Sequence, residues 1–379
     1  MRIALDASSM LPARTGIGNY TAHLIKELVA RAPHHEFKLF MNSYRHPVPP
    51  DEFLYLANVR RYHWKLPGPY LLRSWQWLRF PPMELFTGPF DIFHAPASIV
   101  APRVAGKFVI TVHDLYFKRH PEHCDTMGGL YLASTLERGL RAADRIIAVS
   151  NTTRRDLQRF YQVSSHKIDV IYEGVDERFS VINNDVLIQN FRTEYCLPET
   201  FILTVGTLEP RKNFIGLLEA YARLREIYAV PPPLVVVGLR GWKATGIYAS
   251  IARLKLENSV IFTDYVDDQH LPLIYNAARF FVFPSFFEGF GLPIIEAMAC
   301  GLPVTCSNAE ALQEVAGDAA LFFDPHSRES MAQAMRRMLS SRSTREELRE
   351  KGIERATLYK WRLTARKTIR TYERALSGT

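Results

Sequence analysis

Short apolar runs alternate with longer amphipathic segments along the whole chain. Runs rich in Val, Ile, Leu and Phe are typical of buried parallel strands, and the segments between them have the length and period of helices. The pattern therefore predicts repeated β-α-β units and an α/β protein. In the first half we expect strands at 2–7, 36–41, 59–64, 91–94, 108–113, 145–149 and 167–172, and helices at 18–30, 130–142 and 152–161.

The same alternation starts again after a polar stretch at residues 183–200. The chain of 379 residues is also longer than one hydrophobic core usually supports. We therefore predict two Rossmann-like, doubly wound parallel-sheet domains, residues 1–180 and 181–360, with a linker between Val175 and Thr200 and a cleft between their strand ends. In the second half we expect strands at 201–205, 234–237, 260–265, 280–284, 303–306 and 320–323, and helices at 214–228, 247–256, 270–278, 292–300, 328–340 and 361–376.

Two glutamates flank a glycine-rich turn in the second half. Residues 280–285 are an apolar run of strand composition that ends in a proline and a serine, and residues 292–300 form an apolar helical segment followed by a Gly-Leu-Pro stop. Glu288 is therefore expected in the loop after a strand, and Glu296 about one turn inside the following helix.

The carboxyl end of a parallel strand is where open α/β sheets bind their ligands. The backbone N–H groups of Gly289, Phe290, Gly291 and Leu292 are expected to face an anion there. Each carboxylate can accept hydrogen bonds from a pair of sugar hydroxyls. An ordinary strand-turn-helix joint with solvated glutamates is the simpler alternative, but two carboxylates in these positions favour a sugar-nucleotide site.

Arg211 and Lys212 follow another predicted strand and directly precede a helix, in the motif Gly206-Thr207-Leu208-Glu209-Pro210-Arg211-Lys212-Asn213. A guanidinium grips phosphate oxygens in bidentate fashion, and an ammonium neutralises them as a point charge. A solvated basic cap is the alternative, although cations at a helix start oppose the macrodipole unless an anion binds there. The pair therefore suits a leaving diphosphate.

The first domain has two weaker candidates at its strand ends. Gly16 and Gly18 lie between the first strand and a helix, but Thr21 stands where a dinucleotide-binding GxGxxG motif has its third glycine. We expect instead a loop that shapes the cleft and contacts the leaving phosphate or the acceptor. His113 ends a buried strand, where a hydrogen bond to a sugar hydroxyl or to a developing charge competes with a purely structural role.

Composition narrows the partner and the compartment. A formal net charge of +8 and a pI near 9.3 suit an anionic partner such as a nucleotide diphosphate, phospholipid head groups or nucleic acid. The cysteines form no CxxC pair and predict buried thiols in a reducing compartment. The start of the chain has no signal-peptide pattern, and no run is long enough to span a bilayer. We expect a cytoplasmic protein.

Together these motifs resemble those of the retaining glycosyltransferases of family 4, which have the GT-B fold. The resemblance spans nearly the whole chain, and its most specific element is the Glu-x7-Glu pattern from Glu288 to Glu296. The motif at 206–213 is similar to that of a mannosyltransferase-like branch that builds bacterial surface polysaccharides, in which GDP-mannose is a frequent donor and UDP- and dTDP-sugars also occur. The other matching segments are residues 15–20, His113-Asp114 and Val149-Ser150.

The resemblance implies a role for each matching residue. Glu288 is expected to bind hydroxyls of the donor sugar, and Glu296 the ribose hydroxyls of the nucleotide. Thr207 stands where some relatives carry a further arginine, so Arg211 and Lys212 would be the only two cations that neutralise the diphosphate.

His113 would contact the donor sugar near its 6-position, and the backbone of residues 289–292 would hold the sugar and diphosphate. The other residues expected to bind the donor are Gly16, Gly18, Gly206, Gly238, Tyr265 and Val266, with Gly241, Trp242 and Lys243 in a neighbouring loop.

The family retains the anomeric configuration, yet no residue here stands out as the nucleophile. We expect front-face attack, in which the leaving phosphate accepts the acceptor proton while Arg211, Lys212 and the helix N-terminus stabilise the diphosphate. A covalent route through Glu288 is the alternative. No Asp-x-Asp motif lies near these loops, so neither a metal nor another cofactor is expected. Family analogy also places the helix at 361–379 back on the first domain, as part of a hinge.

The acceptor region is less defined. Residues 60–65 and 70–80 mix cations with large aromatic side chains, a composition that suits a membrane interface and a polyprenyl-linked acceptor. A core-packing helix with its arginines in water explains the same residues equally well.

The combined expectation is a hexosyltransferase, in particular a mannosyltransferase that uses GDP-mannose. Its acceptor would be a saccharide or lipid-linked saccharide in polysaccharide or lipopolysaccharide synthesis, at the inner face of the cell membrane. The alternatives are a UDP- or dTDP-sugar-dependent transferase, a sugar-nucleotide epimerase, and a nucleic-acid-binding or non-catalytic sugar-nucleotide-binding protein. No recognition module supports nucleic-acid binding.

Overall fold

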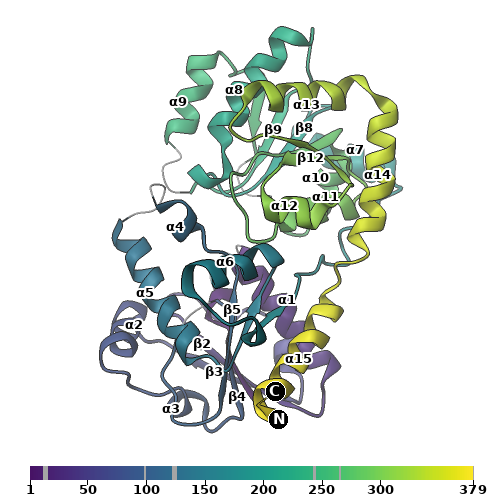
Figure 1. Cartoon of the computed structure of the whole chain (residues 1–379). Coiled ribbons are helices and arrows are strands. Elements are labelled where there is room, and N and C mark those ends of the chain that lie inside the picture. Colours follow the sequence, from purple (N-terminus) through teal and green to yellow (C-terminus); the bar gives the residue numbers. More distant parts are fainter. Residues whose placement is uncertain (12–15, 98–99, 122–125, 242–244, 264–265, 379) are drawn as a thin grey trace. The chain divides into compact units, whose positions relative to one another are not determined.

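The computed structural model describes residues 1–11, 16–97, 100–121, 126–241, 245–263 and 266–378. The chain forms two compact units (Figure 1). The first comprises Met1–Gly174 and Lys360–Thr379, and the second comprises Val175–Tyr359. Each unit has its own parallel sheet covered by helices, so the predicted α/β architecture is confirmed.

The first unit contains a seven-stranded sheet in the order β3-β2-β1-β4-β5-β6-β7, with every neighbouring pair parallel. All seven strands expected from the apolar runs are present. Their bounds are β1 Arg2–Asp6, β2 Glu36–Asn42, β3 Val59–Trp64, β4 Ile92–Ala95, β5 Lys107–Val112, β6 Arg145–Ala148 and β7 Ile168–Val170.

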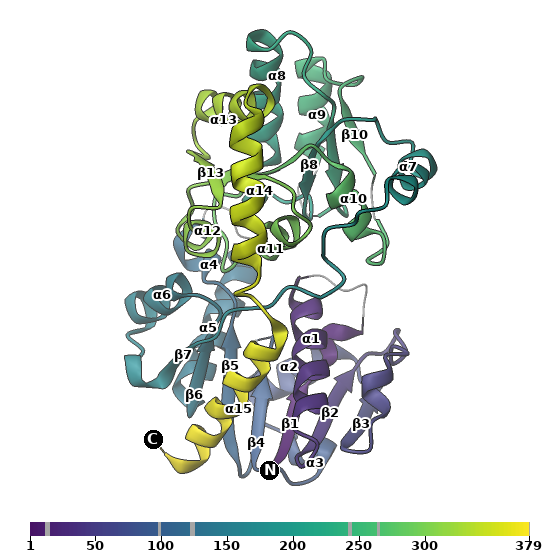
Figure 2. The ribbon, with the colours of Figure 1, turned by 90° about the vertical axis from the view of Figure 1, so that its right-hand side faces the viewer.

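Helices from both ends of the chain pack on this sheet. The C-terminal helix α15 (Trp361–Ser377) lies against α1 (Gly16–Arg31), β5 and β6 (Figure 2). The Trp361 and His23 rings stack at this junction, with centroids 5.2 Å apart. The other helices of the unit are α2 Gly68–Trp77, α3 Glu84–Thr87, α4 Tyr116–Arg119, α5 Thr126–Ala142 and α6 Asn151–Tyr161, with short 3-10 turns at Ser8–Met10, Glu52–Tyr55 and Ser165–Lys167.

The second unit has a six-stranded parallel sheet in the order β10-β9-β8-β11-β12-β13. Its strands are β8 Ile202–Val205, β9 Leu234–Val237, β10 Val260–Phe262, β11 Phe280–Phe283, β12 Val304–Ser307 and β13 Ala320–Phe323. Its helices are α7 Asp185–Glu194, α8 Phe214–Ile227, α9 Thr245–Leu254, α10 Leu271–Ala277, α11 Leu292–Ala299, α12 Glu310–Ala316, α13 Arg328–Ser340 and α14 Arg342–Ala356, with a 3-10 turn at Pro210–Lys212.

The segment that we expected to be a linker is part of the second unit. Residues 175–200 contain α7, which is capped by Asn184 and buries Ile188 and Phe191 in the core of the unit. The mean composition of this segment is polar because most of the helix faces water, and this obscured the two apolar positions. The pattern also gave no helix at α12 or α14.

The cysteines only partly follow the expectation of buried thiols. Cys300 and Cys306 are buried free thiols, and burial raises the pKa of both. Cys196 is exposed, because it lies in the turn after α7 with a left-handed φ of 49°. Cys124 lies outside the described residues.

Each sheet has a point at which the strand order reverses. In the first unit the chain proceeds outward on one side from β1 and on the other side from β4, and in the second unit from β8 and β11. The two loops that leave such a pair at its carboxyl edge diverge and leave room for a ligand. The loops after β8 and β11 carry Arg211, Lys212 and Glu288, which therefore meet at the reversal point of the second sheet.

Candidate functional site

A buried ion cluster joins the loops after β8 and β11. The Arg211 guanidinium donates through Nη1 to Glu288 Oε2 at 2.8 Å, and Lys212 Nζ donates to Glu288 Oε1 at 2.7 Å. Arg211 is also paired with Glu209, at 2.9 Å from Nη2 to Oε1. Arg211, Lys212 and Glu288, which were predicted from two separate sequence motifs, are thus in direct contact, although 76 positions separate Lys212 from Glu288.

Backbone and side-chain amides hold the two loops together. The Phe286 N–H donates to the Arg211 carbonyl at 3.0 Å. Asn213 is buried with a left-handed φ of 56°, and its Nδ2 donates to the carbonyls of Pro284 and Pro325. An asparagine tolerates this conformation better than most residues. Asn213 therefore fixes the turn that presents Arg211 and Lys212.

The opposite charges of Glu288 and the two cations set the pKa values of the cluster together with burial. Burial opposes the charge on Glu288, but Arg211 and Lys212 outweigh it and bring the pKa of that carboxyl below its ordinary value. Burial also lowers the pKa of Lys212, helped by the nearby Arg211 and opposed by Glu288. The lysine stem passes close to Gly206, and its ammonium lies 5.0 Å from the centroid of the Phe283 ring.

Two glycines in this site have a positive φ and leave no room for a Cβ, which would meet the Gly206 backbone at Gly238 and the Leu312 side chain at Gly291. Gly238, after β9, has a φ of 154°, and a Cβ there would lie 2.0 Å from the Gly206 carbonyl oxygen. Gly291 has a φ of 112° and is the N-cap of α11. Side chains at these positions would push apart the loops after β8 and β9, or the start of the helix that follows Glu288.

Glu296 occupies an environment of its own on α11. Tyr275 OH donates to its Oε2 at 2.9 Å. Burial raises the pKa of Glu296 to about 7, against an opposing effect of the Tyr275 hydrogen bond. The two glutamates of the Glu-x7-Glu pattern therefore differ: Glu288 is ionised between two cations, whereas Glu296 titrates near neutrality. The sequence named Glu296 but not its partner Tyr275, which comes from α10.

The remaining residues expected at this site are placed only in part. Gly289, Phe290 and Gly291 are buried, and Leu292 is the first residue of α11. Val266 is buried in the same core as β11. Tyr265, Trp242 and Lys243 lie outside the described residues.

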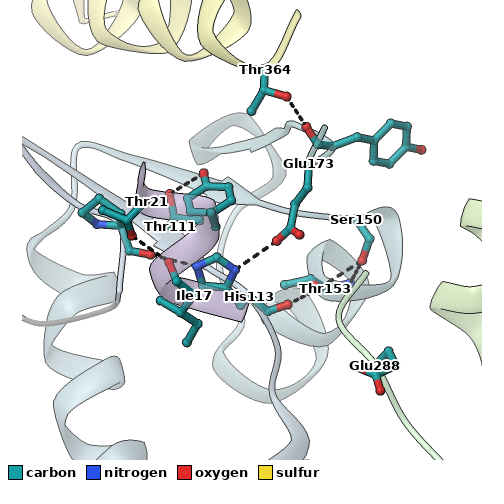
Figure 3. Close-up of polar contacts among 12 residues, drawn as sticks. Ile17, Thr21, Thr111, His113, Ser150, Thr153, Glu173, Glu288 and Thr364 are labelled. Atoms are coloured by element: carbon teal, nitrogen blue, oxygen red, sulfur yellow. Dashed lines mark hydrogen bonds and ion pairs between the residues drawn. The ribbon is translucent and has the colours of Figure 1, made fainter. Parts of the chain in front are cut away.

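In the first unit, the His113 ring lies between two acceptors just after β5. Its Nδ1 is 3.2 Å from Glu173 Oε1, and its Nε2 is 2.9 Å from the Pro96 carbonyl oxygen (Figure 3). Burial opposes a charge on the ring, but the hydrogen bond and negative charge of Glu173 outweigh it and raise the pKa of His113. Because both neighbours can only accept, both ring nitrogens donate and His113 is an imidazolium here.

This arrangement bears on the predicted role of His113 as a sugar ligand. Both of its ring N–H groups are already used inside the unit, and the Tyr20 ring packs edge-on at 4.6 Å between centroids. A direct hydrogen bond from the ring to a hydroxyl would require one of these partners to be replaced. Glu173 was missed by the sequence reading because it comes from a loop after β7, 60 positions away.

Polar side chains continue from this region into the interior. Thr111 Oγ1 lies 3.3 Å from Tyr20 OH and 2.8 Å from His94 Nε2, and His94 Nδ1 lies 2.7 Å from Tyr372 OH on α15. Burial, together with the charge of His113, lowers the pKa of His94 to about 3, so His94 is neutral. The other two candidates of this unit are at the start of α1, where Gly16 is exposed and Gly18 is buried.

The fold of the chain is that of solved glycosyltransferases. Sucrose-phosphate synthase from Thermosynechococcus elongatus superposes with a TM-score of 0.81 at 22% identity, over 100% of both chains. Anabaena Alr3699/HepE in complex with UDP-glucose gives a TM-score of 0.74 at 19% identity, over 98% of this chain and 99% of that chain. Two Rossmann-like units of this kind define the GT-B class of glycosyltransferases.

Sequence comparison gives the family. Residues 14–179 match the model of Glycosyltransferase Family 4, and residues 190–355 match the model of glycosyl transferases group 1. The O-antigen chain mannosyltransferase B of Escherichia coli is 32% identical over 98% of this chain and 100% of its own length. The chain therefore belongs to the family 4 glycosyltransferases and is a hexosyltransferase.

The raised pKa of Glu296 predicts a pH-dependent stability. Its folded pKa of about 7 lies above the ordinary 4.5, so the unfolded chain loses this proton first and stability is lost as the pH rises from 4.5 through 7. The free energy of unfolding of the wild type, relative to Glu296→Gln, should fall by about 3 kcal/mol over this range. Urea unfolding at several pH values measures this difference, with substitution of the exposed Glu257 by Gln as the matched control. A difference for Glu296→Gln that does not change with pH contradicts the burial argument.

The charge of His113 is expected to depend on Glu173. NMR titration of the imidazole should give a pKa above 6.5 in the wild type and a lower pKa in Glu173→Gln, because the hydrogen bond and the negative charge of Glu173 are what raise it. The stabilising effect of Glu173 should be complete below pH 6.5 and disappear as the pH rises through the folded pKa of His113. Equal pKa values in the two proteins would show that Glu173 does not hold the proton.

Proposed function

We propose that this chain transfers mannose from GDP-mannose, with retention of the anomeric configuration, to a saccharide or lipid-linked saccharide acceptor in the synthesis of a bacterial surface polysaccharide. The relative that matches this chain from end to end carries the name of an O-antigen chain mannosyltransferase. Identity of 32% over 98% of the chain supports a shared reaction class, and the choice of mannose rests on that relative's name.

The observation that carries the proposal is the contact set of Arg211, Lys212 and Glu288. The two cations are balanced by Glu288 and Glu209. A diphosphate entering beside them would meet donors that are already oriented, which reduces the cost of reorganisation during the reaction. A carboxylate offers about four lone-pair sites, and Arg211 and Lys212 each take one on a different oxygen of Glu288, so the carboxylate can still accept a hydroxyl group of the donor sugar.

In the proposed mechanism the leaving diphosphate is the base. As the bond between the anomeric carbon and the phosphate oxygen breaks, negative charge grows on the diphosphate, and Arg211 and Lys212 stabilise it. The acceptor hydroxyl attacks from the same face and gives its proton to that phosphate oxygen. Glu288 binds the hydroxyl groups of the sugar and at the same time positions Arg211 and Lys212 beside the diphosphate. The described residues contain no group of three or more His, Cys, Asp or Glu side chains arranged for a metal, and a metal-independent reaction stays our prediction.

A UDP-sugar is the second candidate donor. One structural neighbour, Anabaena Alr3699/HepE, was solved with UDP-glucose, and its fold covers nearly all of this chain. Glu296, the carboxylate proposed for the ribose hydroxyls, would treat GDP and UDP alike, because both carry the 2′- and 3′-hydroxyls, whereas dTDP lacks the 2′-hydroxyl. The choice between GDP and UDP therefore depends on contacts to the base.

The donor can be identified by a turnover assay. The wild-type protein should release GDP from GDP-mannose, and release should accelerate with a mannose-containing acceptor, while UDP-glucose and dTDP-glucose are turned over at least about tenfold more slowly. The anomeric configuration of the product, read by NMR coupling constants, tests retention. Faster turnover of a UDP-sugar would replace GDP-mannose as the donor, and binding without turnover would favour the sensor alternative.

Lys212 offers the most direct test of the proposed chemistry. Lys212→Ala should lower kcat by about 10²- to 10³-fold, because the growing charge on the diphosphate loses one of its two cations. The substitution also removes a partner of buried Glu288, so we expect a loss of stability of at most about 3–5 kcal/mol, moderated by the remaining Arg211. The control is Lys351→Ala, which removes a half-exposed lysine that pairs with Asp318 and Glu347 at the surface. A folded, fully active Lys212→Ala protein would remove this residue from the mechanism.

The proposal includes peripheral association with the inner face of the cell membrane, where a lipid-linked acceptor would be reached. No helix among the described residues is both long and apolar enough to cross a bilayer. Association would then depend on the protein surface, and the aromatic segment near α2 is the place to look for it.

A further inference from the structure

A basic cavity opens at the surface of the first unit, where α2 and α5 end. Its volume is about 480 Å³. The walls come from the last turns of these two helices and from the loop before β5. The lining includes Trp75 and four arginines, Arg79, Arg103, Arg138 and Arg141. No acidic residue among those described lines the cavity, so it is complementary to an anion.

Two of the four arginines form hydrogen bonds within the protein that account for their presence. Arg138 donates through Nη1 to the Gln76 carbonyl at 2.7 Å, which ties α5 to the end of α2. Arg103 donates to the carbonyls of Gly106 and Ala142 and lies 3.6 Å from Asp144. Such contacts satisfy carbonyl groups at helix ends and need no ligand.

Arg79 and Arg141 are different. Arg141 is 78% exposed and, among the described residues, its ion pair is with Glu137 one turn away, a surface contact of small energy. Arg79 is exposed, and within the described part of the chain it forms no ion pair or hydrogen bond. Their positive charges are therefore available to an outside partner.

The backbone at Arg79 is held in an unfavourable conformation. Its φ is 52°, in the left-handed region, which costs a non-glycine residue of order 1–3 kcal/mol. Contacts on both sides impose it: Trp75 Nε1 donates to the Pro81 carbonyl at 2.9 Å, and Ser74 Oγ donates to the Phe80 carbonyl. The turn therefore presents Arg79 at the cavity.

An apolar rim lies beside the cavity on the same turn. Trp77 is 80% exposed, Leu78 is 74% exposed and Phe80 is 58% exposed. Trp75, in contrast, is buried against Phe40 and Phe86. Both alternatives for residues 70–80, a core-packing helix and a membrane-facing segment, thus apply to different parts of the segment. One face of α2 packs in the core, whereas the large apolar side chains at the end of the helix and just after it are exposed.

The cavity belongs to the opposite edge of the sheet from His113. Lys107 begins β5 beside the loop that lines the cavity, whereas His113 follows the end of that strand. A strand of this length spans about 20 Å. The cavity is therefore separate from the candidate donor and acceptor positions at the carboxyl edges.

We propose that this cavity binds the phosphate of an anionic phospholipid while Trp77, Leu78 and Phe80 enter the membrane interface. Guanidinium groups bind phosphate oxygens in bidentate fashion, and aromatic side chains favour the level of the head groups. A soluble phosphorylated ligand would satisfy the arginines but would leave the rim in water, so the combination of both features favours a lipid surface. The inference adds a site to the proposed membrane association and is independent of the donor sugar.

Vesicle flotation of the full chain tests the electrostatic part. Wild type should bind vesicles containing phosphatidylglycerol, bind phosphatidylcholine vesicles much more weakly, and lose affinity as salt rises. Arg79→Gln with Arg141→Gln should weaken binding by about 30-fold, at about fivefold for each arginine near an anionic surface. The matched control is Arg366→Gln with Arg370→Gln, two exposed arginines of α15 in the same unit. The control pair should bind like wild type.

The apolar part is tested by Trp77→Ser with Leu78→Ser, which should weaken binding even at a salt concentration that screens the charges. Both positions are exposed, so thermal unfolding should be unchanged, and turnover with a soluble acceptor should match wild type in every variant. Undiminished binding of either double variant overturns the proposal. Equal loss in the control pair also overturns it, because binding would then follow net charge. A wild-type protein that binds vesicles but turns over no sugar nucleotide would contradict the proposed function and still support this site.

Discussion

The carboxylate of Glu288, buried between Arg211 and Lys212, is the interaction on which the candidate donor site depends. A buried carboxylate without partners would cost several kcal/mol, so the two cations have to be in place for this loop to close. The parallel pairing of β8 with β11 puts their loops at the same edge of the sheet. Asn213 and the Phe286 N–H then fix one loop against the other. The cluster thus fixes the geometry of the loops after β8 and β11, and it also positions two cations for a ligand.

The first unit uses charge in a different way. His113 and Glu173 form an ion pair that is nearly enclosed, and the Pro96 carbonyl takes the second ring N–H. Next to this pair, the neutral His94 connects the sheet to Tyr372 of α15. The buried Asp169 adds a second anchor through Thr371, Arg374 and Arg145. These polar contacts explain why a helix from the far end of the chain belongs to the first unit.

The helices that the pattern missed are either mostly exposed or short. In α7 and α14 only a few positions are buried, and in α14 the exposed positions are charged all round, so no apolar stripe marks the helix. The helix α12 is only Glu310–Ala316 and offers too few turns for a period to appear. Trp75 and Trp77 show a related limit of sequence-based prediction, because the aromatic composition of the segment does not tell which of the two rings packs in the core.

The sequence by itself determined the alternation of strands and helices, the duplication of the parallel sheet, and the residues at the strand ends. It could do so because buried parallel strands must be apolar, and because glycines and charges after them have few structural uses. Only the tertiary structure decided which of those residues meet: Glu288 with Arg211 and Lys212, Glu296 with Tyr275, and His113 with Glu173. These pairs join different segments, from 21 to 77 positions apart in the chain. Their ionisation depends on burial and on a partner's charge, which no local pattern contains.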